Sequence, residues 1–319
     1  MTVRLFDRIV IVDWSAAASP QRGANSIWIA ETDGASMEIE NLSTRSAAME
    51  GLAARIEDAN ACEERLLIGF DFPFGYPAGA ADAVFGRPGR CDCRPEGWRL
   101  VWSRLAEMVA DGPKNANNRF KVAAALNAAY GPVGPFWGRP RSQPLAALPE
   151  RKPQGYGEAL PAERRAAELR ARTAQPTWKL NTTGSVGGQS LVGIAALERL
   201  RHAFARRPGR AVTVWPFETG LNALPRAPGS AVITEVYPSL LAPAVLAARA
   251  MGEIADRAQV RLLASALASL DRKGALAPLF AGPPGGLDAT TRSAVEQEEG
   301  WILGLGHEAA LLGALQPNT

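Results

Sequence analysis

The order of apolar segments in the first seventy residues is the feature that most limits the fold of this chain. Short segments rich in β-branched residues come first, at 8–14, 26–32 and 36–42. A helical pattern follows over 44–59, and a further buried strand is indicated at 65–71. This β-β-β-α-β order has hairpin strands first and a helix before the next buried strand. It predicts an α/β fold with a mixed sheet.

The regular pattern then stops. Pro, Gly and Arg recur over 78–184, where helices are indicated at 96–111 and 162–173 and no segment has a persuasive strand pattern. A long stretch of this kind inside an α/β chain is typical of an added element. We therefore expect 78–184 to be a mainly helical or irregular insertion or cap, in a core formed by 1–77 and 185–319.

The C-terminal part of the core returns to alternating strands and helices. Two more strands are predicted, at 211–218 and 231–238. The predicted helices cover 185–207, 240–251, 254–270 and 289–301. The first of these helices ends in basic residues, which is favourable for its dipole.

Composition places the chain among globular proteins. It has 319 residues, of which 47% are hydrophobic and 21% charged, enough to bury a sizeable core. The N-terminus lacks a secretory signal pattern, and no stretch reaches about 18 uninterrupted apolar residues, so we expect a cytoplasmic protein with no membrane partner. Cys62, Cys91 and Cys93, with His202 and His307, are too few for a closed zinc site.

Basic residues concentrate in the middle of the chain. Between Arg139 and Arg210 there are 14 Lys or Arg and 5 Glu, although the net charge of the whole chain is only +3. Such a region favours a polyanionic partner such as nucleic acid, because binding releases counterions. Solvated helix faces over an alanine-rich core explain the same charge equally well.

Acidic residues lie at the ends of the apolar strands. Asp13 closes the first strand, Asp71 closes the strand at 65–71, and Glu235 lies late in the strand at 231–238. The carboxyl ends of neighbouring strands meet at the edge where α/β proteins place ligands. A carboxylate in apolar surroundings needs a partner or a metal ion. Converging acids therefore predict a divalent cation between them.

A fourth acid, Asp256, opens a predicted helix whose apolar spacing indicates packing on the sheet, so its carboxylate is expected at the same edge. Oxygen ligands of this kind favour Mg²⁺ or Mn²⁺, which activate water in phosphodiester hydrolysis. Each acid alone also has an ordinary interpretation as a turn residue, an arginine partner or a helix cap. The pattern at Glu298 and Glu299 favours a solvated helix face over an added site carboxylate.

These segments resemble a family of uncharacterised proteins, a domain-of-unknown-function family predicted to be ribonuclease H-like nucleases. The similarity covers both flanks of the chain and leaves out the insertion. The matching segments are VDWSAA, IGFDFPFGYP, TEVYPSLL, DRAQVRLLASAL and EEGWILGL. The resemblance implies a ribonuclease H-like fold: a mixed five-stranded sheet with its first three strands antiparallel, flanking helices and an acidic metal site.

Carried over to this chain, the resemblance implies that Asp13 and Asp71 are the core metal ligands and catalytic residues, with Asp256 completing the set from a late helix. Glu235 matches the family's EVYP block and is included as a fourth ligand. The chain departs from the family at the bulky Trp14 and in the basic insertion. The resemblance therefore does not say how a duplex enters.

Further segments carry candidate substrate-binding residues. The segment 181–191 places glycines and hydroxyls, including Ser185, ahead of a helix whose N-terminal amides are able to bind phosphate, with Lys179 adding charge. A hinge between insertion and core explains this segment as well. Two tryptophan-containing segments carry Arg139, Arg141 and Lys179 in a pattern suited to stacking bases and holding phosphates. Buried anchoring of these tryptophans is the favoured alternative.

Together the patterns predict a metal-dependent phosphodiester hydrolase that acts on nucleic acid with Mg²⁺ or Mn²⁺. One alternative is a phosphotransferase of the actin-like ATPase group, which has a similar core. Such proteins need a duplicated core and a glycine-rich turn after the first strand, whereas no glycine follows Asp13 until Gly23. The other alternative is a non-catalytic binding or scaffold protein that retains the acids without using them.

Overall fold

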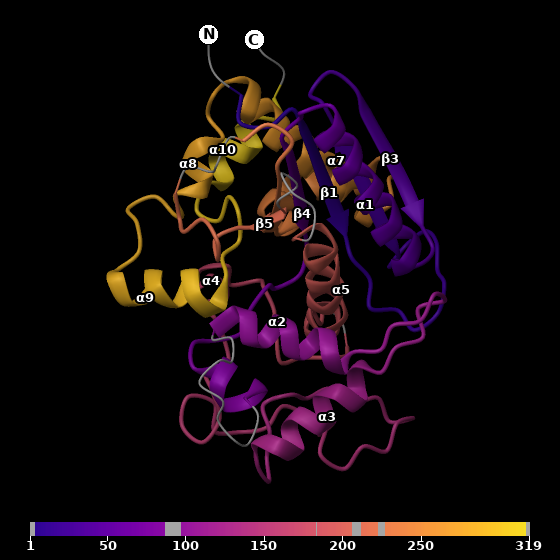
Figure 1. Ribbon diagram of the computed structural model, residues 1–319, viewed down its shortest axis with the longest axis vertical. Coiled ribbons are helices and arrows are strands. Elements are labelled where there is room, and N and C mark those ends of the chain that lie inside the picture. The colour runs from indigo at the N-terminus through magenta and orange to yellow at the C-terminus, as the bar shows by residue number, and fades with distance from the viewer. Residues whose placement is uncertain (1–3, 87–96, 183, 206–211, 223–226, 317–319) are drawn as a thin grey trace.

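A computed structural model shows a mixed sheet with helices on both faces and a lobe of helices and loops below it (Figure 1). It describes residues 4–86, 97–182, 184–205, 212–222 and 227–316, so Cys91 and Cys93 lie outside the described residues. The strands are β1 (Arg8–Asp13), β2 (Ile27–Thr32), β3 (Met37–Leu42), β4 (Leu66–Phe70), β5 (Val212–Val214) and β6 (Ala231–Glu235).

The sheet has six strands in the order β3-β2-β1-β4-β6-β5. The pairs β3–β2 and β2–β1 are antiparallel, whereas β1–β4, β4–β6 and β6–β5 are parallel. The predicted β-β-β-α-β order and the mixed sheet are confirmed. The count of five strands implied by the resemblance is wrong, because Val212–Val214, within the strand predicted at 211–218, pairs with β6 as an edge strand.

The helices account for most of the rest of the chain. They are α1 (Arg45–Ala61), α2 (Gly97–Met108), α3 (Arg119–Tyr130), α4 (Ala166–Arg170), α5 (Gly187–Ala205), α6 (Ala242–Ala250), α7 (Ala255–Arg272), α8 (Ala277–Phe280), α9 (Ala289–Ala294) and α10 (Glu308–Gly313). Thr44 caps α1 by accepting a hydrogen bond from the Ala47 N–H. The sequence analysis missed α3, since its alanine-rich face has no clear amphipathic pattern. None of the helices in the described ranges combines the length and apolar character that a membrane span requires.

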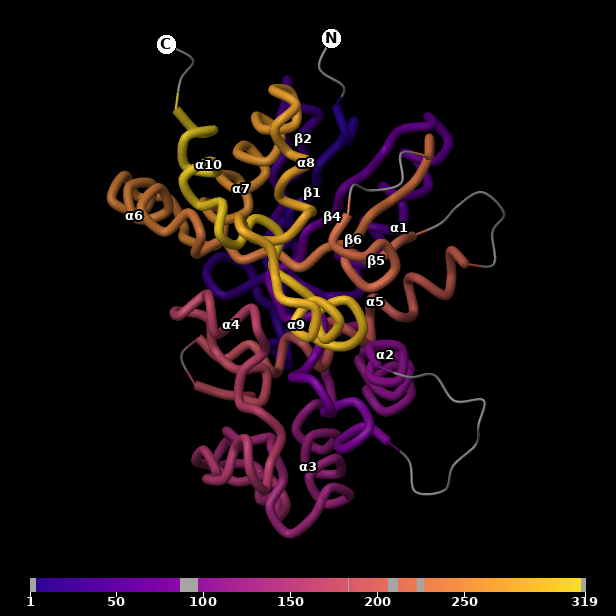
Figure 2. The backbone as a smooth tube through the Cα atoms, turned by 90° about the vertical axis from the view of Figure 1, so that its left-hand side faces the viewer, coloured from indigo at the N-terminus to yellow at the C-terminus, as the bar shows by residue number. Residues whose placement is uncertain are grey.

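The two faces of the sheet pack against different helices. Side chains alternate along a strand, so Ile9 and Ile11 of β1 join the apolar cluster that contains α7, while Val10 and Val12 join the cluster that contains α1 and α5. Figure 2 shows α6, α7 and α10 on one side of the strands and α1 and α5 on the other. We call these the α7 face and the α5 face.

The part of the segment 78–184 that carries α2 and α3 packs against the α5 face, whereas Ala167, Ala171 and Ala174 around α4 join the cluster of the α7 face. Its helices α2 and α3 lie below the sheet in Figure 1. Trp98, Trp102 and Phe120 belong to the same buried cluster as Val10 and Val12, and the Trp102 indole N–H donates to the Phe74 carbonyl at 2.8 Å. Within its described residues the segment contains helices and isolated β-bridges but no extended strand.

Candidate functional site

Asp13 and Asp71 lie next to each other at the carboxyl ends of two adjacent parallel strands. Val12 of β1 pairs with Phe70 of β4, so the next residue along each strand is an aspartate. Both side chains therefore leave the sheet on the α7 face, opposite to Val12 and Phe70. The Trp14 backbone N–H donates to Asp71 Oδ1 at 2.7 Å, which fixes the Asp71 carboxyl beside the end of β1.

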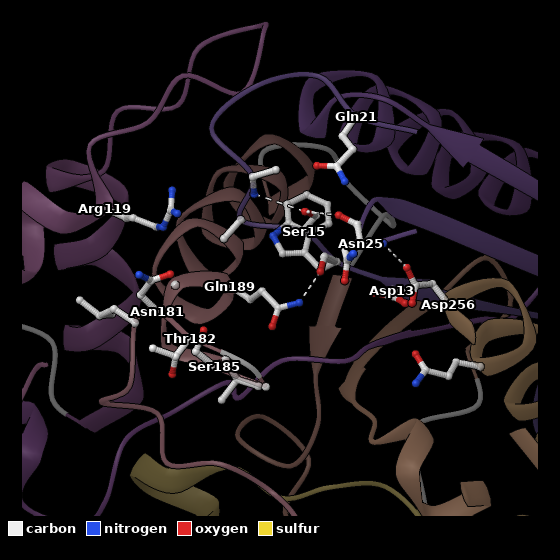
Figure 3. A pocket seen from close by; sticks show the side chains of 18 residues that line it. Asp13, Ser15, Gln21, Asn25, Arg119, Asn181, Thr182, Ser185, Gln189 and Asp256 are labelled. Atoms are coloured by element: carbon white, nitrogen blue, oxygen red, sulfur yellow. Dashed lines mark hydrogen bonds between the residues drawn. The ribbon is translucent and has the colours of Figure 1, made fainter. Parts of the chain in front are cut away.

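Asp256 reaches the same place from the first turn of α7. The helix cap is Ile254, so the interpretation of Asp256 as the N-cap is wrong. One carboxyl oxygen of Asp256 accepts a hydrogen bond from the Asn25 backbone N–H. Figure 3 shows Asp256 beside Asp13. We call Asp13, Asp71 and Asp256 the aspartate cluster.

The aspartate cluster concentrates negative charge in a buried place. Burial, together with the charges of Asp71 and Asp256 and a hydrogen bond to Asp71, raises the pKa of Asp13 well above its usual range. Burial raises the pKa of Asp71 to about 7, against hydrogen bonds from Trp14 and Asp13 that lower it. Burial also raises the pKa of Asp256. Asp13 and Asp71 thus share a proton in preference to carrying two charges.

Glu235 does not join the aspartate cluster, which corrects the expectation from the sequence. Phe70 pairs with Glu235 across β4 and β6, so the glutamate leaves the sheet on the α5 face, opposite to Asp13 and Asp71. Both of its carboxyl oxygens bind the Arg165 guanidinium, at 2.7 and 2.8 Å. Its carboxylate is therefore neutralised inside the protein and has no part in the predicted metal shell.

Arg165 organises a second group of acids. Its guanidinium is fully buried and also binds Glu168 (Nε–Oε1 2.7 Å) and the Glu299 carbonyl at 2.6 Å. The Glu299 carboxylate accepts backbone N–H groups from Ala78 and Ala166, so its predicted place on a solvated helix face is wrong. We call Glu235, Glu168 and Glu299 around Arg165 the glutamate cluster. It joins β6 to Ala78 at the start of the 78–184 segment, to residues 165–168 within that segment and to the C-terminal region.

A cavity of about 680 Å³ opens beside the aspartate cluster. Asp13 and Asp256 line it on one side, whereas Asp71 is not among the residues that line it. The other walls come from the loop after β1, from residues 180–182 and from the first turn of α5, as Figure 3 shows. Within that turn Gln189 donates a hydrogen bond to the Trp14 carbonyl, which joins α5 to the end of β1. A volume of this size is typical of a small-molecule site.

Arg119, at the start of α3, is a cavity residue that the sequence analysis missed. Its Nη1 donates to Asn117 Oδ1 at 2.8 Å, while its Nε is buried and has no hydrogen-bond partner among the described residues. Burial, and the nearby charge of Arg45, lower the pKa of Arg119 to about 10. Arg119 lies outside the basic stretch and outside any motif, so only the fold brings it to the cavity.

Of the predicted substrate-binding residues, one lines the cavity and the others lie elsewhere. Ser185 lines the cavity, as expected. Lys179 does not line it, and its ammonium donates to Gln175 Oε1 at 3.0 Å. Arg139 binds the Glu150 carboxylate at 2.8 Å, and Arg141 lies within the same group, 3.6 Å from Glu150. The structure therefore does not bring Lys179, Arg139 or Arg141 to the cavity beside the aspartate cluster.

The tryptophans of the same segments serve mainly as packing anchors. Trp178 is completely buried between Tyr76 and Phe136, with ring centroids 4.8 and 5.0 Å away. The packing interpretation of this residue is therefore confirmed. Much of the basic stretch is likewise engaged within the chain, as Arg199 illustrates by donating to the Ala106 carbonyl at 2.8 Å. Arg206, Arg207 and Arg210 lie outside the described residues.

The aspartate cluster suits a hydrated divalent cation better than a closed metal shell. Among the described residues, no group of three or more His, Cys, Asp or Glu side chains is arranged to hold a metal ion. The predicted shell of four carboxylates is therefore not formed. Mg²⁺ commonly keeps several waters and binds one or two carboxylates together with substrate oxygens. The adjacent carboxyls of Asp13 and Asp71 provide such a pair of oxygen donors.

In comparisons with known proteins, no family model, no curated protein and no solved structure matched this chain. Function is therefore inferred from the geometry of the aspartate cluster and its cavity.

Proposed function

We propose that this protein is a metal-dependent phosphodiester hydrolase of the ribonuclease H-like type that acts on nucleic acid. One observation carries the proposal: Asp13 and Asp71 lie together on the α7 face, beside a cavity, with no salt bridge to either among the described residues. Burying two acids without a counter-charge is unfavourable for folding. A divalent cation and a substrate phosphate are ligands that would offset this free energy.

The topology of the sheet adds support. The strands β3, β2, β1, β4 and β6 form a mixed sheet whose first three strands in the chain are antiparallel, with helices on both faces. This is the arrangement that the resemblance of the acidic segments implies. Strand β5 extends it at the edge, away from β1 and β4. The acids therefore occupy the carboxyl ends of the central strands, where α/β proteins bind ligands.

In this proposal Asp13 and Asp71 hold Mg²⁺ or Mn²⁺ after losing their shared proton to solvent. A bound ion of this kind supplies activation of water and stabilisation of negative charge on the phosphoryl group. Asp256 lines the cavity and adds negative charge beside the pair. The loop after β1, fixed by Gln189, positions Asp71 through the Trp14 N–H. The reaction needs no protein nucleophile.

The test combines metal binding with hydrolysis. Calorimetric titration with Mn²⁺ is expected to show binding to the wild-type protein, and a labelled single-stranded oligonucleotide is expected to be cleaved in the presence of Mn²⁺ or Mg²⁺. Asp13→Asn and Asp71→Asn should abolish both signals. Glu38→Gln, an exposed carboxylate on β3, is the matched control and should change neither. Full cleavage by Asp13→Asn, or no Mn²⁺ binding by the wild type, would refute the assignment.

A further inference from the structure

The cavity has opposite charges on its two sides. Figure 3 shows Asp13 and Asp256 on one side and Arg119 reaching in from the other, near Asn181. Gln189 lies between them. The acidic side is the place of the proposed hydrolysis, which leaves the role of the basic side to be explained.

Arg119 forms no salt bridge with an acid in the part of the chain that the structure describes. Asp111 is the acid whose charge acts on it, yet both oxygens of Asp111 bind Arg45 at 2.6 Å. Arg119 therefore has the repulsion of Arg45, the attraction of an already paired Asp111, a hydrogen bond to Asn117 and a contact with the Phe120 ring, 4.3 Å from its centroid. A largely buried guanidinium in this situation is unfavourable unless an anion reaches it. Arg119 lines the cavity, so an anion bound there reaches the guanidinium, although the buried Nε itself is not exposed to the cavity.

The first turn of α5 faces the same place. Ser185, Gly188 and Gln189 line the cavity, and the N-terminus of this long helix favours negative charge. Gly188 also makes room for Arg119, because a Cβ at this position would lie 3.2 Å from the guanidinium Nε. An unpaired guanidinium and a helix N-terminus thus converge independently on one region. Arg recognises phosphate through parallel N–H donors.

We propose that Arg119 and the first turn of α5 form a phosphate subsite, which binds a phosphate group other than the one cleaved at the aspartate cluster. The ligand is then a nucleotide or a short single strand with phosphates at both ends of the cavity. The volume of about 680 Å³ agrees with a ligand of this size. Phosphate binding at Arg119 does not depend on the proposed function. The idea that the same ligand places a second phosphate at the aspartate cluster rests on the proposed function.

The experiment measures binding by calorimetry in EDTA, so that no metal ion contributes. The probes are a dinucleotide with a 5′-phosphate, the same dinucleotide without it, and a nucleoside 5′-monophosphate. We expect the 5′-phosphate to tighten dinucleotide binding about tenfold or more in the wild type. Arg119→Gln should remove this preference and Arg119→Lys should keep part of it. Arg249→Gln, an exposed arginine on α6, is the control that should retain it.

The outcomes separate the subsite from the proposed function. Gly188→Ala crowds the guanidinium without removing its charge and should also weaken the preference for the 5′-phosphate. This second variant keeps the test valid if Arg119→Gln fails to fold. Asp71→Asn should keep the preference while losing hydrolysis. A phosphate preference in a protein that cleaves nothing would leave the subsite standing and remove the hydrolase proposal. Equal binding of both dinucleotides by the wild type, or an unchanged preference in Arg119→Gln, would overturn the subsite. Monophosphate binding as tight as dinucleotide binding would assign the site to free nucleotides.

Discussion

The aspartate and glutamate clusters lie at the same end of the sheet, but an arginine neutralises the glutamates whereas the aspartates lack such a partner among the described residues. Glu235 is paired with a fully buried guanidinium that also binds Glu168. Asp13 and Asp71 have no basic partner among the described residues, and burial raises the pKa of both carboxyls. The glutamate cluster stabilises the fold by neutralising its acids. The aspartate cluster reduces stability and leaves charge beside a cavity, which is typical of functional sites.

This comparison teaches that an acid at a strand end is not informative by itself. Glu235 and Asp71 follow equally apolar strands, and β4 and β6 are neighbours. What differs is the face of the sheet that each side chain enters. On the α5 face Glu235 meets Arg165, whereas on the α7 face Asp71 meets Asp13 and the start of α7. Mutations in the two clusters should therefore change stability in opposite directions.

Removing Arg165 should have the largest effect. Arg165→Met leaves Glu235 and Glu168 buried without their cation, and breaking a buried ion pair in this way costs about 3–5 kcal/mol. Urea denaturation should show this loss in the free energy of unfolding. Arg249→Met, on the surface of α6, is the control and should be nearly neutral. An unchanged urea midpoint for Arg165→Met would show that the glutamate cluster does not stabilise the fold.

Gly75 tests how closely the chain is packed at the glutamate cluster. A Cβ at this position would lie 2.1 Å from the Glu298 carbonyl oxygen and 2.6 Å from that of Glu299. Gly75→Ala should therefore lower the free energy of unfolding by about 3 kcal/mol through overpacking. Thermal and urea unfolding measure the change, with Gly313→Ala, where a Cβ meets nothing within 4 Å, as the control. A stable Gly75→Ala variant would mean that the two segments separate easily.

A mutation in the aspartate cluster should raise the free energy of unfolding, whereas the two mutations at the glutamate cluster lower it. The pKa of Asp71 is about 7 in the folded protein, above the value of 3.8 expected when unfolded. Its protonated form therefore contributes stability that is present below about pH 4 and lost as the pH rises through 7. Asp71→Asn does not titrate, so it should be about 1–2 kcal/mol more stable than the wild type at pH 8 and should lose this advantage at pH 4.

Urea unfolding without metal at the two pH values measures this difference, and Glu38→Gln should show none. A lower stability of Asp71→Asn at pH 8 would mean that the pair of acids carries no repulsion. Adding Mn²⁺ should reverse the order at pH 8, because only the wild type gains from binding the ion.

Asp256 should give the smallest change. It is partly exposed, and an asparagine keeps an oxygen that accepts the Asn25 N–H. Asp256→Asn should shift the free energy of unfolding by no more than about 0.5 kcal/mol. In a Mn²⁺ titration it should weaken binding less than Asp13→Asn does. Complete loss of Mn²⁺ binding in Asp256→Asn would place this residue among the direct ligands and change the two-carboxylate description of the site.

Much of this fold was predictable because patterns of neighbouring residues determine where its strands and helices lie. Runs of β-branched residues produced β1 to β4 close to their expected bounds, and the apolar spacing after Asp256 produced α7. The convergence of Asp13 and Asp71 followed from adjacent parallel strands that end on acids. Helix α3 escaped prediction, since an alanine-rich helix carries little periodic signal, and β5 is shorter than the strand predicted over 211–218.

By itself, the sequence determined the strand order along the chain and the presence of acids at the ends of the central strands, because hydrophobic periodicity depends on neighbouring residues. Only the tertiary structure decided which acids meet. A shift of one residue in register sends a side chain to the other face, which is why Glu235 pairs with Arg165 and not with a metal site. Arg119 likewise reaches the cavity only through packing of the 78–184 segment, since no local pattern specifies contacts over such separations.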